Sequence, residues 1–341
     1  MRHNPLILEQ TPIIVFLFGM LFMTSCAPFG HLTRISPEGH EGPQASQCGT
    51  CHVEQYQEWQ GSAHAEAFTS KSFQEAAGSP AEGECLKCHT PLGAPEKKTE
   101  ARSFHQEEGV TCISCHLSQG KMVGPHATSA LFTPHPVQED RQLYRSSDQC
   151  TTCHEETRAQ GQKATAGQQS KNCQECHMPA VQRRATQGTN LFSNILVSFE
   201  DKVQTRSHST TLGNMANFPG AVTITTMALS QGQDAPALTI TIHNNLPHDL
   251  PTGTFGAKEI KLSLVFLHKG VPVAEKRVVV SDEKSPLAAN DSKRLVLPLS
   301  PAATHADTLR LNLERHSDNH TGKPPIILSS KIIDSVSEAF H

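Results

Sequence analysis

Ten of the eleven cysteines in this 341-residue chain fall into five identical C-x-x-C-H motifs. At this composition, chance would produce about 0.02 such motifs in a chain of this length. The spacing is typical of covalent haem attachment, because two thiols bond the haem vinyl groups and the adjacent histidine reaches the iron. The motif cysteines are Cys48, Cys51, Cys85, Cys88, Cys112, Cys115, Cys150, Cys153, Cys173 and Cys176. The predicted proximal ligands are His52, His89, His116, His154 and His177.

Two other uses of paired cysteines fit the sequence less well. A disulfide framework would not require a histidine after every second cysteine. Zinc sites would need paired motifs with alternating ligand types. The sequence therefore predicts five covalently bound haem c groups, all attached within residues 48–177.

The composition agrees with a core made largely of cofactor. Only 36% of the residues are hydrophobic, and the chain has one Trp and two Tyr, whereas soluble domains average about 45–50% apolar residues when Gly is counted. We expect the porphyrins to supply the missing apolar bulk, with short helices and loops around them. The net charge of −4 and the absence of any basic block indicate no nucleic-acid partner.

The sixth iron ligand decides between electron transfer and catalysis. Fifteen histidines lie outside the motifs. The most specific candidate is His64, which follows a segment of helical character where Tyr56 and Trp59 share one face at spacing i, i+3. The other candidates, in a Pro-rich segment after the third motif or just past the haem region, are His126, His135 and His208.

The N-terminal segment predicts export. Residues 11–25 carry no charge, but they are shorter than the roughly 20 apolar residues of a membrane span and are typical of a signal-peptide core. Small residues before Cys26 (MTSC) resemble a bacterial lipobox, so residues 1–26 are interpreted as a lipoprotein signal peptide with Cys26 as the lipidated N-terminus. The resemblance to bacterial lipoproteins implies that Ala27, in place of Asp, favours sorting to the outer membrane. An ordinary signal peptide and an uncleaved anchor remain open alternatives.

The second half of the chain changes character. After about residue 220 there are no cysteines, and apolar residues alternate with polar ones. The predicted strands are residues 221–229, 237–242, 259–267, 271–281, 293–299, 308–313 and 325–333. Such short strands predict an all-β immunoglobulin-like sandwich. The expected order is a linker at 27–45, a mainly α/loop multihaem cytochrome c domain with little regular structure at 46–220, and the β-sandwich at 221–341.

Residues 48–65 (CGTCHVEQYQEWQGSAHA) resemble the first-haem motif of a multihaem cytochrome c family. Its best-known member is the tetrahaem cytochrome that accepts electrons from hydroxylamine oxidoreductase. Further similar segments are residues 85–91, 109–112, 124–125, 173–179, 206–208 and 244–253. The resemblance implies that His64 is a distal ligand and that His248 faces a haem from the β-domain. Residues 168–170 lack the aromatic segment that is usual in this family.

These features predict an exported pentahaem c-type cytochrome that relays electrons between other redox proteins of the cell envelope. It would be attached to the membrane by its lipid and would face the periplasm or the cell surface. One alternative is an oxidoreductase with an open haem, acting on a small nitrogen or sulfur species; the sequence has no C-x-x-C-K motif, which weakens a nitrite-reductase-type interpretation. Another alternative is a subunit of an extracellular cytochrome filament. We expect an electron carrier rather than a catalyst.

Overall fold

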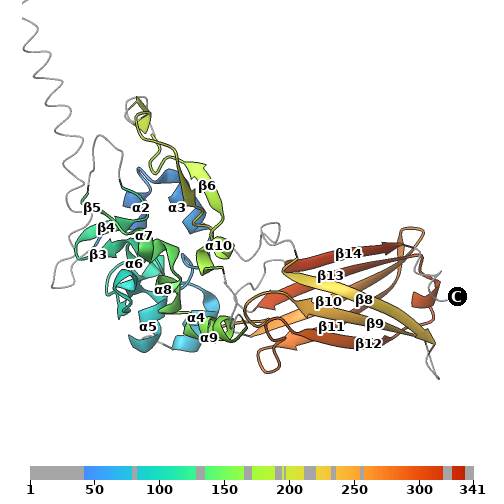
Figure 1. Cartoon of the computed structure of the whole chain (residues 1–341). Helices are drawn as coiled ribbons and strands as arrows, with labels where there is room; N and C mark the ends of the chain where they lie inside the picture. Colours follow the sequence, from blue (N-terminus) through green and yellow to red (C-terminus); the bar gives the residue numbers. More distant parts are fainter. Residues whose placement is uncertain are drawn as a thin grey trace, which may run out of the picture. The chain divides into compact units, whose positions relative to one another are not determined.

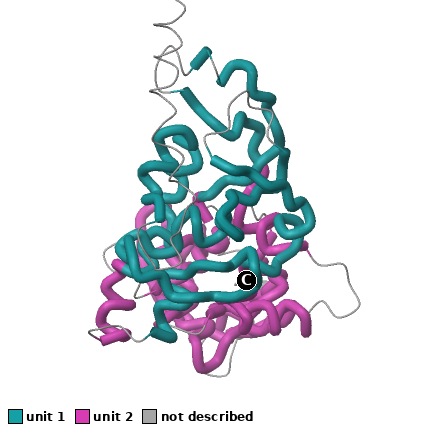
Figure 2. Tube along the Cα trace, turned by 90° about the vertical axis from the view of Figure 1, so that its left-hand side faces the viewer, with its two compact units in different colours: residues 1–68, 83–149, 181–208 teal, residues 69–82, 150–180, 209–341 magenta. Residues whose placement is uncertain are grey.

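The chain forms two compact units, each assembled from several separate stretches of sequence (Figure 2). The computed structural model describes residues 42–78, 83–127, 135–164, 171–188, 194–195, 197–210, 220–231, 236–253, 257–317 and 325–334. Unit 1 comprises residues 1–68, 83–149 and 181–208, and unit 2 comprises residues 69–82, 150–180 and 209–341. The first three motifs therefore belong to unit 1, and the last two group with the β-rich region in unit 2. The predicted domain boundary after residue 220 stays a prediction.

The motif-bearing part of the chain contains short helices and very short strands (Figure 1). Its longest described helix, α9, has ten residues. The helices are α2 (Ala45–Cys48), α3 (Val53–Gln60), α4 (Lys71–Ala77), α5 (Gly83–His89), α6 (Cys112–His116), α7 (Arg141–Arg145), α8 (Asp148–Thr151), α9 (Glu155–Ala164) and α10 (Cys173–His177), with 3-10 turns η3 (Ala94–Glu96) and η4 (Gln106–Glu108). The strands are β1 (Pro91–Leu92), β2 (Glu100–Ala101), β3 (Leu117–Ser118), β4 (Lys121–Gly124), β5 (Val137–Glu139), β6 (Ala180–Arg183) and β7 (Val203–Arg206).

The motif cysteines lie on or beside short helices. On a helix, residues three apart share one face, so both thiols of a motif can reach the same haem. The start of α10 is fixed by a capping box: the Asn172 side chain accepts a hydrogen bond from Glu175 N (3.0 Å), and the Glu175 carboxylate accepts one from Asn172 N (2.7 Å). This box holds the fifth motif in its helical turn.

A close backbone crossing joins the segment after α3 to the start of the third motif. Val110 N donates to His64 O at 2.9 Å. Gly109, next to it, has φ +59°, and an added Cβ would lie 2.5 Å from the same carbonyl oxygen. Only glycine fits this crossing without displacing the backbone. The contact fixes the backbone of His64 beside α6.

Seven longer strands form the β-rich region of unit 2. They are β8 (Val222–Gln231), β9 (Pro236–Asn244), β10 (Lys258–His268), β11 (Val271–Asp282), β12 (Ser292–Pro298), β13 (Thr308–Ser317) and β14 (Ile326–Asp334), with a 3-10 turn η6 (Ala303–His305) between β12 and β13. Each predicted strand overlaps one of these, so the strand prediction is confirmed.

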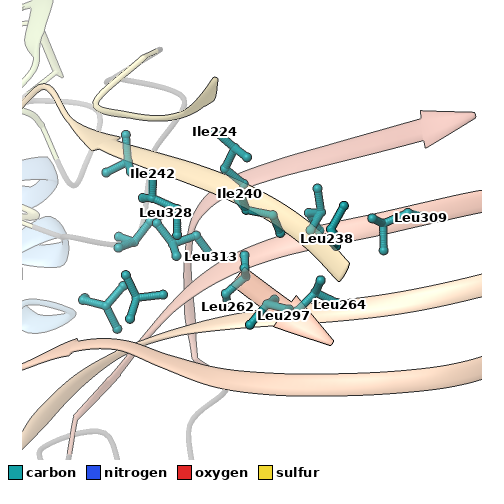
Figure 3. Packing of buried hydrophobic residues seen from close by; sticks show 14 of the residues in the cluster. Ile224, Leu238, Ile240, Ile242, Leu262, Leu264, Leu297, Leu309, Leu313 and Leu328 are labelled. Atoms are coloured by element: carbon teal, nitrogen blue, oxygen red, sulfur yellow. The ribbon is translucent and has the colours of Figure 1, made fainter. Parts of the chain in front are cut away.

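These strands make two antiparallel sheets that share one core. The sheet orders are β11-β10-β13-β14 and β12-β9-β8. A single cluster of buried side chains draws on both sheets, including Ile240 of β9 and Leu262 of β10, each 0% exposed (Figure 3). Burial of each such side chain contributes about 2 kcal/mol. In a constant-type immunoglobulin domain the fourth strand pairs with the fifth, whereas here β11 pairs with β10. The immunoglobulin-like assignment stays a prediction.

The N-terminal predictions lie outside the described residues. This holds for the signal peptide at residues 1–26, for Cys26 and for most of the linker at 27–45. Among the residues that are described, no helix combines the length and apolar character needed to cross a membrane.

Candidate haem-binding sites

The rings of three motif histidines are oriented by backbone carbonyl oxygens. A histidine whose Nδ1–H donates to a carbonyl presents its Nε2 to a metal, and such partners fix both tautomer and ring orientation. The Nδ1–O distances are 2.7 Å for His52 and Ala185, 2.5 Å for His89 and Ala67, and 2.8 Å for His116 and Val123. In these three motifs the histidine is therefore oriented so that Nε2 is the nitrogen available to an iron.

Three of the predicted distal ligands lie opposite motif histidines. A histidine nitrogen binds a metal at about 2 Å and the ring centre lies about 1 Å further back, so two rings on opposite sides of one iron are about 6 Å apart. The measured distances between ring centres are 6.3 Å for His52 and His135, 6.0 Å for His116 and His208, and 6.4 Å for His177 and His248. The residues present therefore fit haems with two histidine ligands at the first, third and fifth motifs.

Burial keeps these histidines in the form that binds a metal. It lowers the pKa of His208 to about 4, and the neighbouring His116 acts in the same direction. It also lowers the pKa of His177 to about 4, with a further lowering from His248. Because only a neutral imidazole can bind a metal, both rings are in the ligating state near neutral pH.

The loop after β9 carries His248 and is held in place by Asn244. This asparagine is 0% exposed. Its Nδ2 contacts the carbonyl oxygen of His248 (2.9 Å) and those of Leu287 and Ala288 (3.1 Å each). On the other side of the loop, Gln160 of α9 accepts hydrogen bonds from Asp249 N and Thr252 Oγ1. The β-rich region thus places His248 beside His177 of the fifth motif, and its role as an iron ligand stays a prediction.

Two other predicted distal ligands have different surroundings. His64 lies in the turn after α3, where Tyr56 and Trp59 stack on one face with ring centres 5.8 Å apart, as predicted. The indole Nε1 of Trp59 donates to Val110 O at 2.8 Å. His126 Nε2 lies 2.9 Å from Gln204 O, so in this arrangement the nitrogen that usually binds iron has a carbonyl partner. Iron ligation by His64 and His126 stays a prediction.

Tyr144 belongs to the third motif's surroundings and was missed in the sequence analysis. Its ring stacks on His116 with centres 5.3 Å apart. Its hydroxyl lies 2.7 Å from Val123 O and 2.9 Å from both Cys115 O and His116 Nδ1. Burial raises the pKa of Tyr144, so the hydroxyl stays protonated. The only available signal was that Tyr144 is one of just two tyrosines in the chain.

Two pairs of motifs are neighbours in space. Before haem is attached, the thiols of Cys48 and Cys112 lie close enough together that Cys112 raises the pKa of Cys48 and Cys48 lowers that of Cys112. In unit 2, His154 lies near enough to His177 to add to the lowering of its pKa, after burial and His248. The first motif is therefore adjacent to the third, and the fourth to the fifth.

Comparison with known proteins agrees with this geometry. Residues 47–117 match the family described as cytochrome c554 and c-prime, and residues 144–182 match the doubled CXXCH motif. The fold is similar to that of a penta-heme cytochrome c552 from Thermochromatium tepidum, with a TM-score of 0.56, 18% identity, and coverage of 86% of this chain and 98% of that one. This chain is a multihaem c-type cytochrome.

The similarity to the Thermochromatium protein shows the fold alone, because the two sequences share only 18% of their residues. A Bordetella pertussis protein described as ApaA also matches, with 16% identity and a TM-score of 0.21 over 33% of this chain and 92% of that chain. We draw no conclusion about this cytochrome from so low a TM-score.

Proposed function

We propose that this cytochrome carries electrons between other redox proteins of the cell envelope, with five haem c groups that are mostly held by two histidines. The observation that supports this most strongly is the spacing of the three ring pairs, 6.0–6.4 Å between ring centres. A haem with histidine on both faces has no position left for a substrate, which suits electron transfer. The haem count of five rests on the five motifs.

The protein residues would orient the haems and tune their potentials. When bound, each haem takes up and releases one electron, and neighbouring haems exchange it. Carbonyl oxygens of Ala185 and Val123 hold the proximal rings of His52 and His116. Burial around the rings excludes water, and in a low-dielectric site the local charges then have a larger effect on potential.

Location, anchoring and partners belong to the same proposal. The predicted signal peptide and lipobox would place the protein on a membrane through Cys26, at the outer membrane and facing the periplasm or the cell surface. Labelling cells with a radioactive fatty acid tests this step. The wild-type chain should be labelled and the Cys26→Ser variant should not; equal labelling of both would contradict the anchor.

We also infer a more specific family for the chain and a more specific fold for its β-rich region. The match of residues 47–117 supports the family of the tetrahaem cytochrome that accepts electrons from hydroxylamine oxidoreductase. The two-sheet core supports an immunoglobulin-like sandwich, and its loop at residues 244–253 would contribute His248 as a ligand.

Low-temperature EPR of the oxidised protein, combined with a pyridine haemochromogen assay, tests the relay. We expect five haems per chain and only low-spin ferric signals. A strong high-spin ferric signal that changes on addition of cyanide or nitrite would contradict the relay and would support the alternative oxidoreductase with an open haem.

A further inference from the structure

The carboxylate of Glu58 lies between a buried arginine and the histidine that faces the third motif. Arg183, whose side chain is 7% exposed, donates to Glu58 Oε1 at 2.8 Å and to Oε2 at 2.9 Å. The backbone N–H of His208 donates to Oε2 at 2.8 Å. Glu58 therefore fixes the backbone from which the His208 ring extends.

The His208 ring has an unsatisfied nitrogen on the side of this carboxylate. Its Nδ1 is buried and makes no hydrogen bond that meets normal geometry, and Glu58 Oε2 lies 4.0 Å away. When Nε2 binds iron, the neutral ring carries its proton on Nδ1 and needs an acceptor. An N–H···O bond is about 2.9 Å long, so a movement of about 1 Å would complete it.

One other acceptor lies near this ring. The carbonyl oxygen of Arg206 is close enough to influence the ionisation of His208. It already accepts a hydrogen bond from Arg183 Nη2 at 3.0 Å. The carboxylate is the stronger acceptor, because hydrogen bonds to charged groups are shorter and stronger than neutral ones.

The partner of His208 differs from those of three other histidines in these pairs. Nδ1 of His52, His116 and His248 lies within hydrogen-bonding distance of a neutral backbone carbonyl. A carboxylate instead of a carbonyl makes an imidazole a more basic ligand. A nearby negative charge also favours the ferric over the ferrous state, because the ferric haem carries one more positive charge.

We propose that Glu58 is a positioning residue that accepts a hydrogen bond from Nδ1 of His208, directs the ring toward the third haem and lowers the potential of that haem. This inference rests on the proposed function, in which His208 is the distal ligand there. The positive charge of Arg183 partly compensates the negative charge of Glu58 and so limits the electrostatic effect of Glu58 on the His208 ring. A simple structural ion pair between Glu58 and Arg183 would affect stability without selecting one haem.

Glu58→Gln, with Glu54→Gln as the matched control, tests the proposal. Glu54 also faces Arg183, at 3.4 Å, but its side chain is 51% exposed. Redox-poised EPR follows each low-spin signal separately. In Glu58→Gln we expect the equilibrium constant for reduction of one of the five haems to rise about tenfold. This corresponds to an increase of about 60 mV in the one-electron potential of that haem. Unchanged potentials, or an equal shift in Glu54→Gln, would overturn the proposal.

Arg183→Gln supplies a second measurement, in which the haem potential should shift in the opposite direction. This variant leaves the charge of Glu58 less compensated, so the same haem should become harder to reduce. Non-specific damage to the structure would shift both variants in one direction, and that result would also overturn the proposal.

His208→Ala separates this inference from the proposed function. It should convert one low-spin signal to high spin, and this identifies the third haem. If no signal changes, the ligand assignment fails, and the positioning role fails with it. If His208→Ala removes one low-spin signal but Glu58→Gln does not shift the potential of the haem that gives this signal, only the positioning role of Glu58 is overturned.

Discussion

Replacing Asn244 with alanine should loosen the loop that holds His248 beside His177 of the fifth motif. The amide has two protons, which are shared among three carbonyl oxygens, and its Oδ1 accepts a bond from Leu246 N at 3.1 Å. Three bonds at about 1 kcal/mol each give a loss of about 3 kcal/mol in the free energy of unfolding of the β-rich region. Because the loop begins directly after β9, the His248 ring should also lose its fixed position beside His177.

Calorimetry and EPR of the intact cytochrome measure these two effects. We expect a lower unfolding temperature and a new high-spin signal from one haem. Asn245→Ala is the matched control, because the neighbouring Asn245 side chain bonds Gly220 O and Thr223 Oγ1 at an exposed position. The reasoning is refuted if Asn244→Ala is no less stable than Asn245→Ala, or if its EPR spectrum equals that of the wild type.

Three further predictions concern single residues. His64→Ala should convert one haem to high spin, and an unchanged EPR spectrum would remove His64 as a ligand. Tyr144→Phe should cost about 1 kcal/mol of stability through its lost hydroxyl contacts, measured by thermal unfolding; an unaltered melting temperature would contradict this. Iron ligation through Nε2, and burial, which lowers the pKa of the metal-free ring from 6.5 to about 4, both keep the folded His208 from binding a further proton, so the unfolded state binds this proton more readily. The contribution of this difference to the free energy of unfolding is fully present above pH 6.5 and should fall by about 3 kcal/mol towards pH 4. A melting temperature that does not change with pH would contradict this prediction.

Much of the fold could be predicted because its signals are local in sequence. Alternation of apolar and polar residues located the seven strands of the β-rich region. A motif of five residues likewise defined each haem attachment point, and the helical spacing of Tyr56 and Trp59 placed them on one face. The N-terminal predictions around Cys26 lie outside the described residues, and the structure does not test them.

The pairing of histidines could not be predicted because it depends on contacts between segments that are far apart in the sequence. Arg183 and Glu58 hold the end of β7 against α3, and this contact helps to place His208 beside His116. A single sequence carries no local signal for such a contact. Tyr144 was missed for the same reason, since its partners lie more than twenty residues earlier in the chain.

The ring pairs are the central claim, and EPR of His135→Ala, His208→Ala and His248→Ala tests them most directly. Each variant should lose one low-spin ferric signal, a different one in each case, and gain a high-spin signal equal to one haem. If all three variants keep the wild-type spectrum, these histidines are not axial ligands, and the account of this cytochrome as a chain of bis-histidine haems is contradicted.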